Sequence, residues 1–124
     1  MLPTIDQFIA SVTANALGFS RNAYVREPGF TSLYIRYGGW RCIDGQRVPC
    51  LELASIVAKQ TGRGTFTRLA KRLSRQHNLY VESVVNERFR AKLPQLGFTF
   101  HAGTNPPSYY LLLQPKEATH GSVC

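Results

Sequence analysis

The amino-terminal stretch of the chain repeats apolar residues at helical spacing. Thr4 and Gln7 match a capping box, in which each side chain bonds the backbone N–H of the other residue. Apolar residues then recur three, four, seven and eleven positions after Ile5, until Gly18. This period predicts an amphipathic helix that begins near Ile5 and ends near Gly18.

The pattern changes to strand-like segments from residue 32 onward. Three segments, SLYIRY, WRCID and VPCLELASIVA, occupy residues 32–37, 40–44 and 48–58. Gly38 and Gly39 separate the first two, and the pair Asp44-Gly45 separates the last two. We expect three consecutive antiparallel strands, with a tight turn at Asp44-Gly45 between the second and the third.

A helix and a further strand are predicted next. Phe66, Leu69, Ala70 and Leu73 form one apolar stripe that runs to about Gln76, and LYVESVV at residues 79–85 alternates as a strand. One helix of about a dozen residues joins this strand to the preceding one. The two strands are therefore expected to be parallel neighbours joined by a right-handed crossover, which makes a βαβ unit.

The last part of the chain predicts a short helix and a hairpin. Asn86 is a good cap for a helix that Pro94 kinks or ends and Gly97 closes. FTFH at residues 98–101 and YYLLLQ at 109–114 flank a loop with two prolines, which indicates a final antiparallel hairpin.

Length and composition favour one folded domain. The 124 residues suit a single domain, expected over residues 1–114, with a polar tail at 115–124. An apolar share of 44% argues against disorder and against a fibrous repeat. We expect an α/β (α+β) fold whose mixed, mostly antiparallel sheet has a central parallel pair. Because the chain has neither a long apolar run nor a signal-peptide pattern, it is expected in the cytoplasm.

The positive charge of the chain is concentrated in one region. The net charge is +8, and residues 59–92 hold nine basic and two acidic side chains, a net charge of +7. Such a field favours an anionic partner, which is a nucleic acid, an acidic protein or a phosphorylated cofactor.

A glycine-rich turn at residues 61–66 lies where a strand ends and a helix begins. Unpaired backbone N–H groups and the positive end of the helix dipole make such a junction suitable for a pyrophosphate. Cations follow along one helix face at Arg68, Lys71, Arg72 and Arg75. A tight turn beside a solvated basic face explains the same residues equally well. The segment is neither a P-loop nor a dinucleotide fingerprint.

Two motifs in this order resemble the GNAT superfamily of acetyl-CoA-dependent N-acyltransferases, over residues 32–114. The family signature Q/R-x-x-G-x-G/A is similar to the segment Thr61, Gly62, Arg63, Gly64, Thr65 and Phe66. The later pattern N-x-x-A-x-x-x-Y-x-x-x-G-F is similar in spacing to Asn86, Phe89, Leu93, Gly97 and Phe98. The short outline also resembles small GNAT-type proteins of bacterial viruses, for which the compartment is the host cytoplasm.

The resemblance implies acetyl-CoA as co-substrate and an amine as acceptor. It places the pyrophosphate on the main chain of residues 61–66, and the pantetheine arm beside Asn86 and the strand edge formed by Ile56, Val57 and Ala58. It also implies that the parallel strands splay apart around the cofactor, and that the amine attacks the thioester directly. The acceptor, on a protein or associated with a nucleic acid, is left open, as is a homodimer.

Departures from the family pattern keep a second function open. Thr61 replaces the usual Gln or Arg, and Phe66 replaces a small residue. Leu93 stands where many members have a Tyr that protonates the leaving thiolate. The segment before residue 32 predicts one helix where the family has two. The alternative is a non-catalytic GNAT-fold module whose basic surface binds nucleic acid or an acidic host protein.

Two carboxylates on the central strands are candidates for the general base. Strand alternation groups Glu52 with Cys50, Ala54 and Ile56, and Glu82 with Tyr80, Val84 and Asn86. Either carboxylate could instead form an ordinary ion pair.

The remaining polar residues point to packing rather than to a metal site. Tyr80, Tyr109 and Tyr110 are candidate substitute acids, and packing in the core or at an interface is the alternative role for each. The three histidines, His77, His101 and His120, have no metal-ligand spacing and are expected to be exposed to solvent or in loops. The cysteines form no C-x-x-C pair. We therefore expect no metal.

Overall fold

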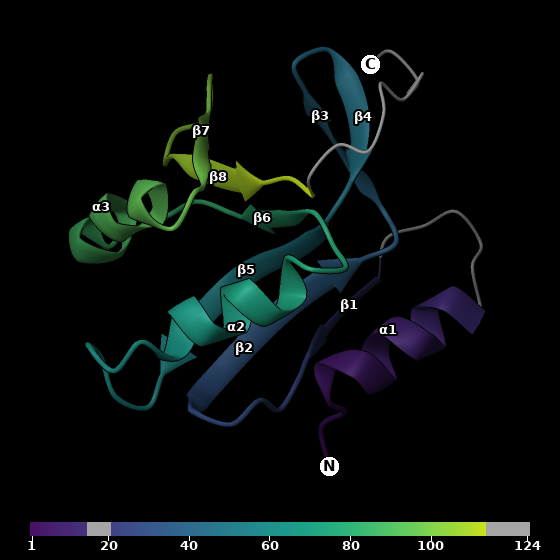
Figure 1. The fold of residues 1–124 in the computed structure, drawn as a ribbon. Helices are drawn as coiled ribbons and strands as arrows, with labels where there is room; N and C mark the ends of the chain where they lie inside the picture. The colour runs from purple at the N-terminus through teal and green to yellow at the C-terminus, as the bar shows by residue number, and fades with distance from the viewer. Residues whose placement is uncertain (15–20, 114–124) are drawn as a thin grey trace.

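The computed structural model describes residues 1–14 and 21–113, and within these ranges three helices pack against a mixed sheet (Figure 1). The helices are α1 (Ile5–Ala14), α2 (Thr65–Leu73) and α3 (Glu87–Gln95). The six-stranded sheet has the order β1-β2-β5-β6-β8-β7. Its strands are β1 (Arg21–Tyr24), β2 (Phe30–Tyr37), β5 (Leu51–Ala58), β6 (Leu79–Val81), β7 (Thr99–His101) and β8 (Ser108–Leu111). The expected α+β fold is confirmed.

The parallel pair lies at the centre of this sheet. β5 and β6 are parallel and are joined through α2, as the sequence predicts. The four other neighbouring pairs of the sheet are antiparallel, including the expected β7–β8 hairpin. The carboxyl ends of β5 and β6 therefore lie at the same edge of the sheet. In parallel sheets, functional loops are commonly found at this edge.

The expectation of three consecutive antiparallel strands is wrong. β3 (Trp40–Ile43) and β4 (Gln46–Pro49) form a separate two-stranded sheet, which projects beyond the main sheet in Figure 1. Their turn is the expected one, because Asp44 and Gly45 both have positive φ, 52° and 78°. The chain leaves the hairpin at Cys50, and β5 then pairs with β2 instead of with β3. The hairpin is thus inserted between two neighbours of the main sheet.

The helices α1 and α2 contribute to one apolar core with the sheet. The capping box of α1 is confirmed, because Thr4 N–H donates to Gln7 Oε1 at 3.0 Å and Gln7 N–H donates to Thr4 Oγ1 at 3.1 Å. Ile5, Phe8 and Val12 of α1 and Leu69, Ala70 and Leu73 of α2 are buried in this core with Leu33, Ile35, Leu51 and Leu53 of the sheet. The predicted end of α1 near Gly18 lies outside the described residues.

The opposite face of the central strands holds a smaller cluster. Cys50, Tyr80 and Ile43 are buried together there, and Ile43 comes from the β3–β4 hairpin. Glu52 is buried on the same side of β5 as Cys50, because neighbouring strand residues face opposite ways. The hairpin therefore covers part of this face and brings polar side chains over it.

One predicted strand is longer than the strand in the structure, whereas the predicted end of the short helix is confirmed. β6 ends at Val81 rather than near residue 85, because Ser83 has a φ of 51° that extended strands do not adopt. Helix α3 retains Pro94 in its last turn and is followed by Gly97 at a φ of 95°. The polar tail predicted at 115–124 lies outside the described residues.

No helix in the described part of the chain combines the length and apolar character that a membrane crossing requires.

Candidate functional site

The junction between β5 and α2 is an open loop with unpaired backbone amides. Gly64 is the N-cap of α2 at a φ of 69°, and no side chain caps the helix. Among the described residues, none accepts a hydrogen bond from the N–H groups of residues 62–67. Gly62 has a φ of 75°, and a Cβ there would meet nothing within 4 Å. The loop thus presents the N–H groups and helix end that suit an anion.

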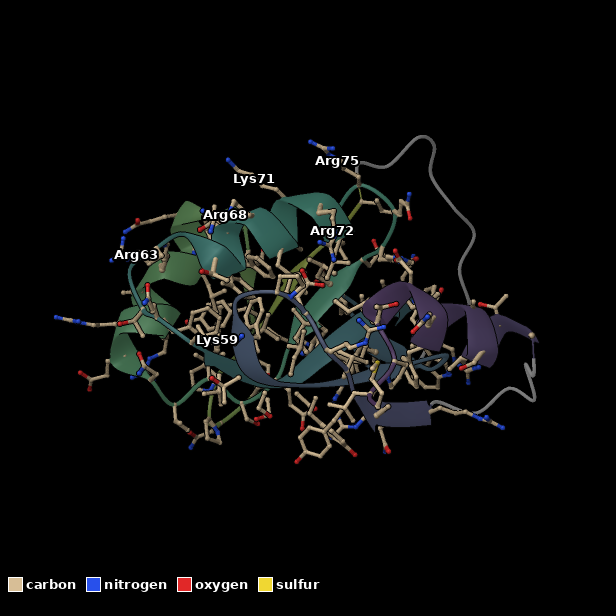
Figure 2. The ribbon with its side chains drawn as sticks, turned by 90° about the horizontal axis from the view of Figure 1, so that it is seen from below. Lys59, Arg63, Arg68, Lys71, Arg72 and Arg75 are labelled. Carbon is tan, nitrogen blue, oxygen red and sulfur yellow. The ribbon has the colours of Figure 1, made fainter. Side chains whose placement is uncertain are left out.

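Arg68 braces this loop from the first turn of α2 (Figure 2). Its Nη1 donates to the carbonyl oxygen of Arg63 at 2.9 Å, and a Cβ added at Gly64 would lie 3.3 Å from the same nitrogen. The guanidinium therefore fixes the loop and adds positive charge beside Gly64. Thr61 and Arg63 are exposed, whereas Thr65 is half-buried.

Phe66, which departs from the small residue of the family signature, packs between helices. Its ring meets Phe89 edge-on at a centroid distance of 4.8 Å and lies 6.1 Å from Phe98. The bulky side chain is thus directed into the contact between α2 and α3. It does not cover the glycines of the loop.

The strands β5 and β6 separate shortly before this loop. Their ladder ends at the pair Leu53–Val81, and Glu82 N–H donates to Leu53 O at 3.2 Å. β5 continues to Ala58 with β2 as its partner. The segment that follows β6 turns toward β8 instead. Ser83 N–H donates to Ser108 Oγ at 2.9 Å, and Val84 N–H donates to Pro107 O at 2.7 Å.

The predicted contact residues beside this separation are all accessible. Val57 is exposed, and Ile56 and Ala58 are half-buried against the helix-side core. Asn86 is exposed and caps α3, because its Oδ1 accepts from Phe89 N–H at 2.9 Å. The capping role expected for Asn86 is confirmed, and the amide group remains at the surface.

The structure brings the two candidate bases, Glu52 and Glu82, into one ion cluster. Arg36 Nη1 donates to Glu52 Oε1 at 3.3 Å and also to Glu82 Oε2. Arg41 Nη2 lies 2.6 Å from Glu52 Oε1 and 3.1 Å from Glu82 Oε2. The Glu52 side chain is 6% exposed and the Glu82 side chain 27%. We call these four residues the Arg–Glu cluster.

The two guanidinium groups of the Arg–Glu cluster are stabilised in their charged form by the neighbouring carboxylates. The hydrogen bond with Glu82 is the main reason that the pKa of Arg36 is raised. Burial opposes the charge of Arg41, but the hydrogen bond and attraction of Glu52 outweigh it and raise its pKa. The Arg41 guanidinium also stacks on Tyr80 at 4.5 Å. Both carboxylates therefore face fixed positive charge, and a base role requires one of them to release a guanidinium.

Alternation along β5 does not hold as far as the sequence suggests. The register with β2 shifts between Tyr34 and Ile35, so that Ala54 has no partner in the ladder. This bulge turns Ile56 to the helix-side core, away from the face of Glu52. The expected grouping of Glu52 with Ile56 is therefore wrong. The expected grouping of Glu82 with Val84 is wrong as well. The positive φ of Ser83 turns Val84 into the helix-side core, away from the face of Glu82.

The tyrosines named as substitute acids are mainly packing residues. Tyr80 is 1% exposed, and its hydroxyl lies 2.6 Å from His101 Nδ1. Since His101 Nε2 faces the carbonyl oxygen of Cys42 at 3.0 Å, Nε2 carries the proton and Tyr80 donates to Nδ1. Burial raises the pKa of Tyr80. Tyr109 is buried and Tyr110 half-buried beside His101.

Sequence reasoning missed the partners of these residues. Arg36 lies opposite Glu52 in the β2–β5 register, so the pair could be found once β2 is placed beside β5. Arg41 comes from the inserted hairpin, and His101 from the edge strand β7. No spacing in the sequence predicts these two contacts.

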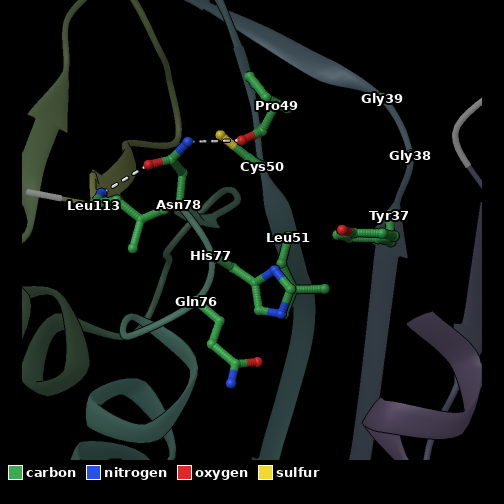
Figure 3. A pocket seen from close by; sticks show the side chains of 10 residues that line it. All are labelled: Tyr37, Gly38, Gly39, Pro49, Cys50, Leu51, Gln76, His77, Asn78 and Leu113. Carbon is green, nitrogen blue, oxygen red and sulfur yellow. Dashed lines mark hydrogen bonds between the residues drawn. The ribbon is translucent and has the colours of Figure 1, made fainter. Parts of the chain in front are cut away.

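A cavity of about 260 Å³ lies at the other end of the parallel pair (Figure 3). Tyr37, Cys50, Leu51, Gln76 and His77 are among its lining residues. A second cavity of about 230 Å³ lies between α2, Gln95 and Leu111. Neither cavity includes residues 56–66 or Asn86. The residues predicted to hold the cofactor are in part exposed (Val57, Thr61, Gly62, Arg63 and Asn86) and in part half-buried (Ile56, Ala58, Gly64, Thr65 and Phe66).

No group of three or more His, Cys, Asp or Glu residues in the described part of the chain could hold a metal ion. Comparisons with protein-family models, curated proteins and solved structures find no match to this chain.

Proposed function

We propose that the protein is a GNAT-type N-acetyltransferase that uses acetyl-CoA and an amine acceptor. The observation that carries this proposal is the end of the β5–β6 ladder at Leu53–Val81, five residues before the end of β5. The strand edge from Ser55 to Ala58 is thereby left beside an open glycine loop. The strand order, with a parallel pair between antiparallel neighbours, supports the same function.

The residues at the junction fit the parts of acetyl-CoA. The unpaired N–H groups of residues 62–67 would bind the pyrophosphate, and Arg68 would add positive charge. The free edge of Ile56, Val57 and Ala58 would bond the amides of the pantetheine arm, with Asn86 on the facing side. A cofactor bound in this way would have its thioester near Leu53, where the strands separate.

Glu82 is better placed than Glu52 to serve as the base. Acyl transfer requires that a base first take a proton from the acceptor ammonium. The amine nitrogen then attacks the thioester carbon, and the departing thiolate takes up the proton that this nitrogen loses. Glu82 follows directly after the last paired residue of β6, and its side chain is the more exposed of the two. A base at this position lies beside the expected thioester.

A non-catalytic acetyl-CoA-binding module is the second candidate. Leu93, at the position of the family Tyr, is 0% exposed inside the core. Both carboxylates also bind guanidinium groups. These observations favour binding without efficient turnover.

Calorimetric titration with acetyl-CoA and CoA tests the binding. We expect saturable binding that Gly62→Glu weakens at least tenfold, because a carboxylate enters the phosphate site. Gly45→Glu is the matched control, since Gly45 has a similar φ of 78° and equally open space in the distant hairpin turn. Absence of binding by the unmodified protein, or equal loss in both variants, would overturn the proposal.

Release of free thiol from acetyl-CoA in the presence of an amine panel separates the two candidates. An enzyme releases thiol, and Glu82→Gln lowers kcat far more than it changes acetyl-CoA affinity. A binding module shows affinity without thiol release.

A further inference from the structure

The outer side of α2 and its flanking turns carries exposed cations in one row. We call Arg63, Arg68, Lys71 and Arg75 the basic ridge, and Figure 2 shows them along one margin of the molecule. Arg72, on the same helix, donates to Glu27 from its two terminal nitrogens, Nη1 and Nη2, at 3.0 and 2.9 Å. The ion pairs of the described residues include none with the basic ridge.

The sequence around the basic ridge supplies no compensating charge. Between Glu52 and Glu82 the chain has six Lys and Arg residues and no Asp or Glu. Like charges three and four residues apart on a helix repel each other. An anionic partner that contacts several of these cations removes this repulsion.

The glycine loop does not account for the far end of the basic ridge. Lys71 lies seven residues after Gly64, which is about 10 Å along a helix, and Arg75 lies farther still. A pyrophosphate on the loop amides would therefore leave Lys71 and Arg75 without a role.

The chemistry of the basic ridge indicates the kind of partner. The large apolar side chains that are exposed, including Trp40 and Phe100, all lie outside residues 59–75. The basic ridge thus lacks the apolar anchors of a protein interface and the aromatic platforms that hold single strands. Three of its four cations are Arg, which binds phosphate oxygens in pairs. We propose that the basic ridge binds the phosphate backbone of a nucleic-acid duplex.

Fluorescence anisotropy measures this binding with a labelled 20-base-pair DNA duplex, an RNA duplex and a single strand, between 50 and 300 mM NaCl. Each phosphate contact contributes about 0.9 to the slope of log affinity against log salt. We expect Lys71→Gln/Arg75→Gln to reduce the slope by about 2 and the low-salt affinity at least tenfold. The control Arg21→Gln/Arg47→Gln removes the same charge from β1 and the hairpin, where both residues are exposed, and retains the slope.

The outcomes separate the basic ridge from general electrostatics and from the proposed enzyme. The proposal is supported if either duplex binds and the Lys71→Gln/Arg75→Gln variant, but not the control, loses affinity and slope. Comparison of the DNA and RNA duplexes shows which of the two is preferred. Equal losses in both double variants, a preference for the single strand, or tighter binding to poly-glutamate overturns it. Acetyl-CoA titration of Lys71→Gln/Arg75→Gln is expected to match the unmodified protein, so failure of duplex binding leaves the acetyltransferase proposal untouched.

Discussion

Glu52 on β5 and Glu82, which directly follows β6, bind the same two guanidinium groups. Glu52 precedes Leu53, the last β5 residue that pairs with β6, and Glu82 follows Val81, the last residue of β6. Arg36 and Arg41 join them with contacts to both carboxylates. The Arg–Glu cluster therefore bridges the two strands at the point where they separate, on the face opposite α1 and α2. The ion pairs of the cluster thus link the two chain segments where the ladder between them stops.

The two carboxylates of the Arg–Glu cluster should differ in their contribution to stability. Glu52→Gln leaves two guanidinium groups beside a buried amide and is expected to lower the free energy of unfolding by about 3 kcal/mol. Glu82→Gln, at a more exposed position, is expected to lower it by about 1 kcal/mol. Urea denaturation followed by circular dichroism measures both. A larger loss for Glu82→Gln would contradict the assigned burial and contacts.

Local patterns in the sequence predicted those elements whose residues interact with near neighbours. The capping box at Thr4 and Gln7, the turn at Asp44-Gly45 and the cap at Asn86 depend on residues three or fewer positions apart. The βαβ unit follows from the length of its connection. Where a local signal and the packing agree, as in the stripe of Leu69 and Leu73, the prediction is confirmed.

Predictions that required long-range pairing were less accurate. Whether β5 pairs with β2 or with β3 depends on which of the two strands binds it better, and local sequence does not decide this. The β3–β4 hairpin has the same strand-like sequence pattern as β2 and β5, so nothing local marks it as a separate sheet. The bulge at Ala54 and the positive φ of Ser83 leave no pattern in the sequence. For the site, the glycine loop was recognisable, whereas the contacts of Arg41 with both carboxylates depend on how the hairpin folds over the sheet.

His77 should make the protein less stable in mild acid. Its imidazole is half-buried beside Tyr37, and burial lowers its pKa from 6.5, an effect that Asp6 partly opposes. As the pH falls, the unfolded chain therefore binds a proton at His77 before the folded protein does. The free energy of unfolding should thus decrease as the pH drops below about 6.5. Urea denaturation at pH 7.5 and 5.5 should show a smaller difference for His77→Gln than for the unmodified protein. An unchanged difference would exclude His77 as the source.

Cys50 should affect stability in alkali and resist alkylation. Burial, with repulsion from Glu52, raises the pKa of its thiol from 9.0 to about 12, against the attraction of Arg41. The unfolded chain loses this proton near pH 9.0 and the folded protein only near pH 12, so stability falls across that interval. The loss between pH 8 and 10 should be smaller in Cys50→Ala. Peptide mass spectrometry after iodoacetamide treatment at pH 8 should find Cys50 modified slowly without urea and rapidly with it.

The turn at Gly29 should be tightly coupled to the first residue of α2. Gly29 has a φ of 90°, and a Cβ there would lie 2.6 Å from Thr65 Cγ2. Gly29→Ala therefore combines backbone strain with a clash against a stiff β-branched side chain, and a loss of about 2–4 kcal/mol in the free energy of unfolding is expected. Thr65→Ser alone removes the methyl group and should lower stability by less than about 1 kcal/mol.

In Gly29→Ala/Thr65→Ser the clash is absent and only the strain at residue 29 remains. The double variant should thus be more stable than Gly29→Ala, with a coupling free energy of about 1 kcal/mol or more. Such coupling would tie the turn to the amino end of α2 and, through it, to the position of the glycine loop. Additive losses would instead show that Gly29 matters only for its backbone conformation, and that the loop is positioned without this contact.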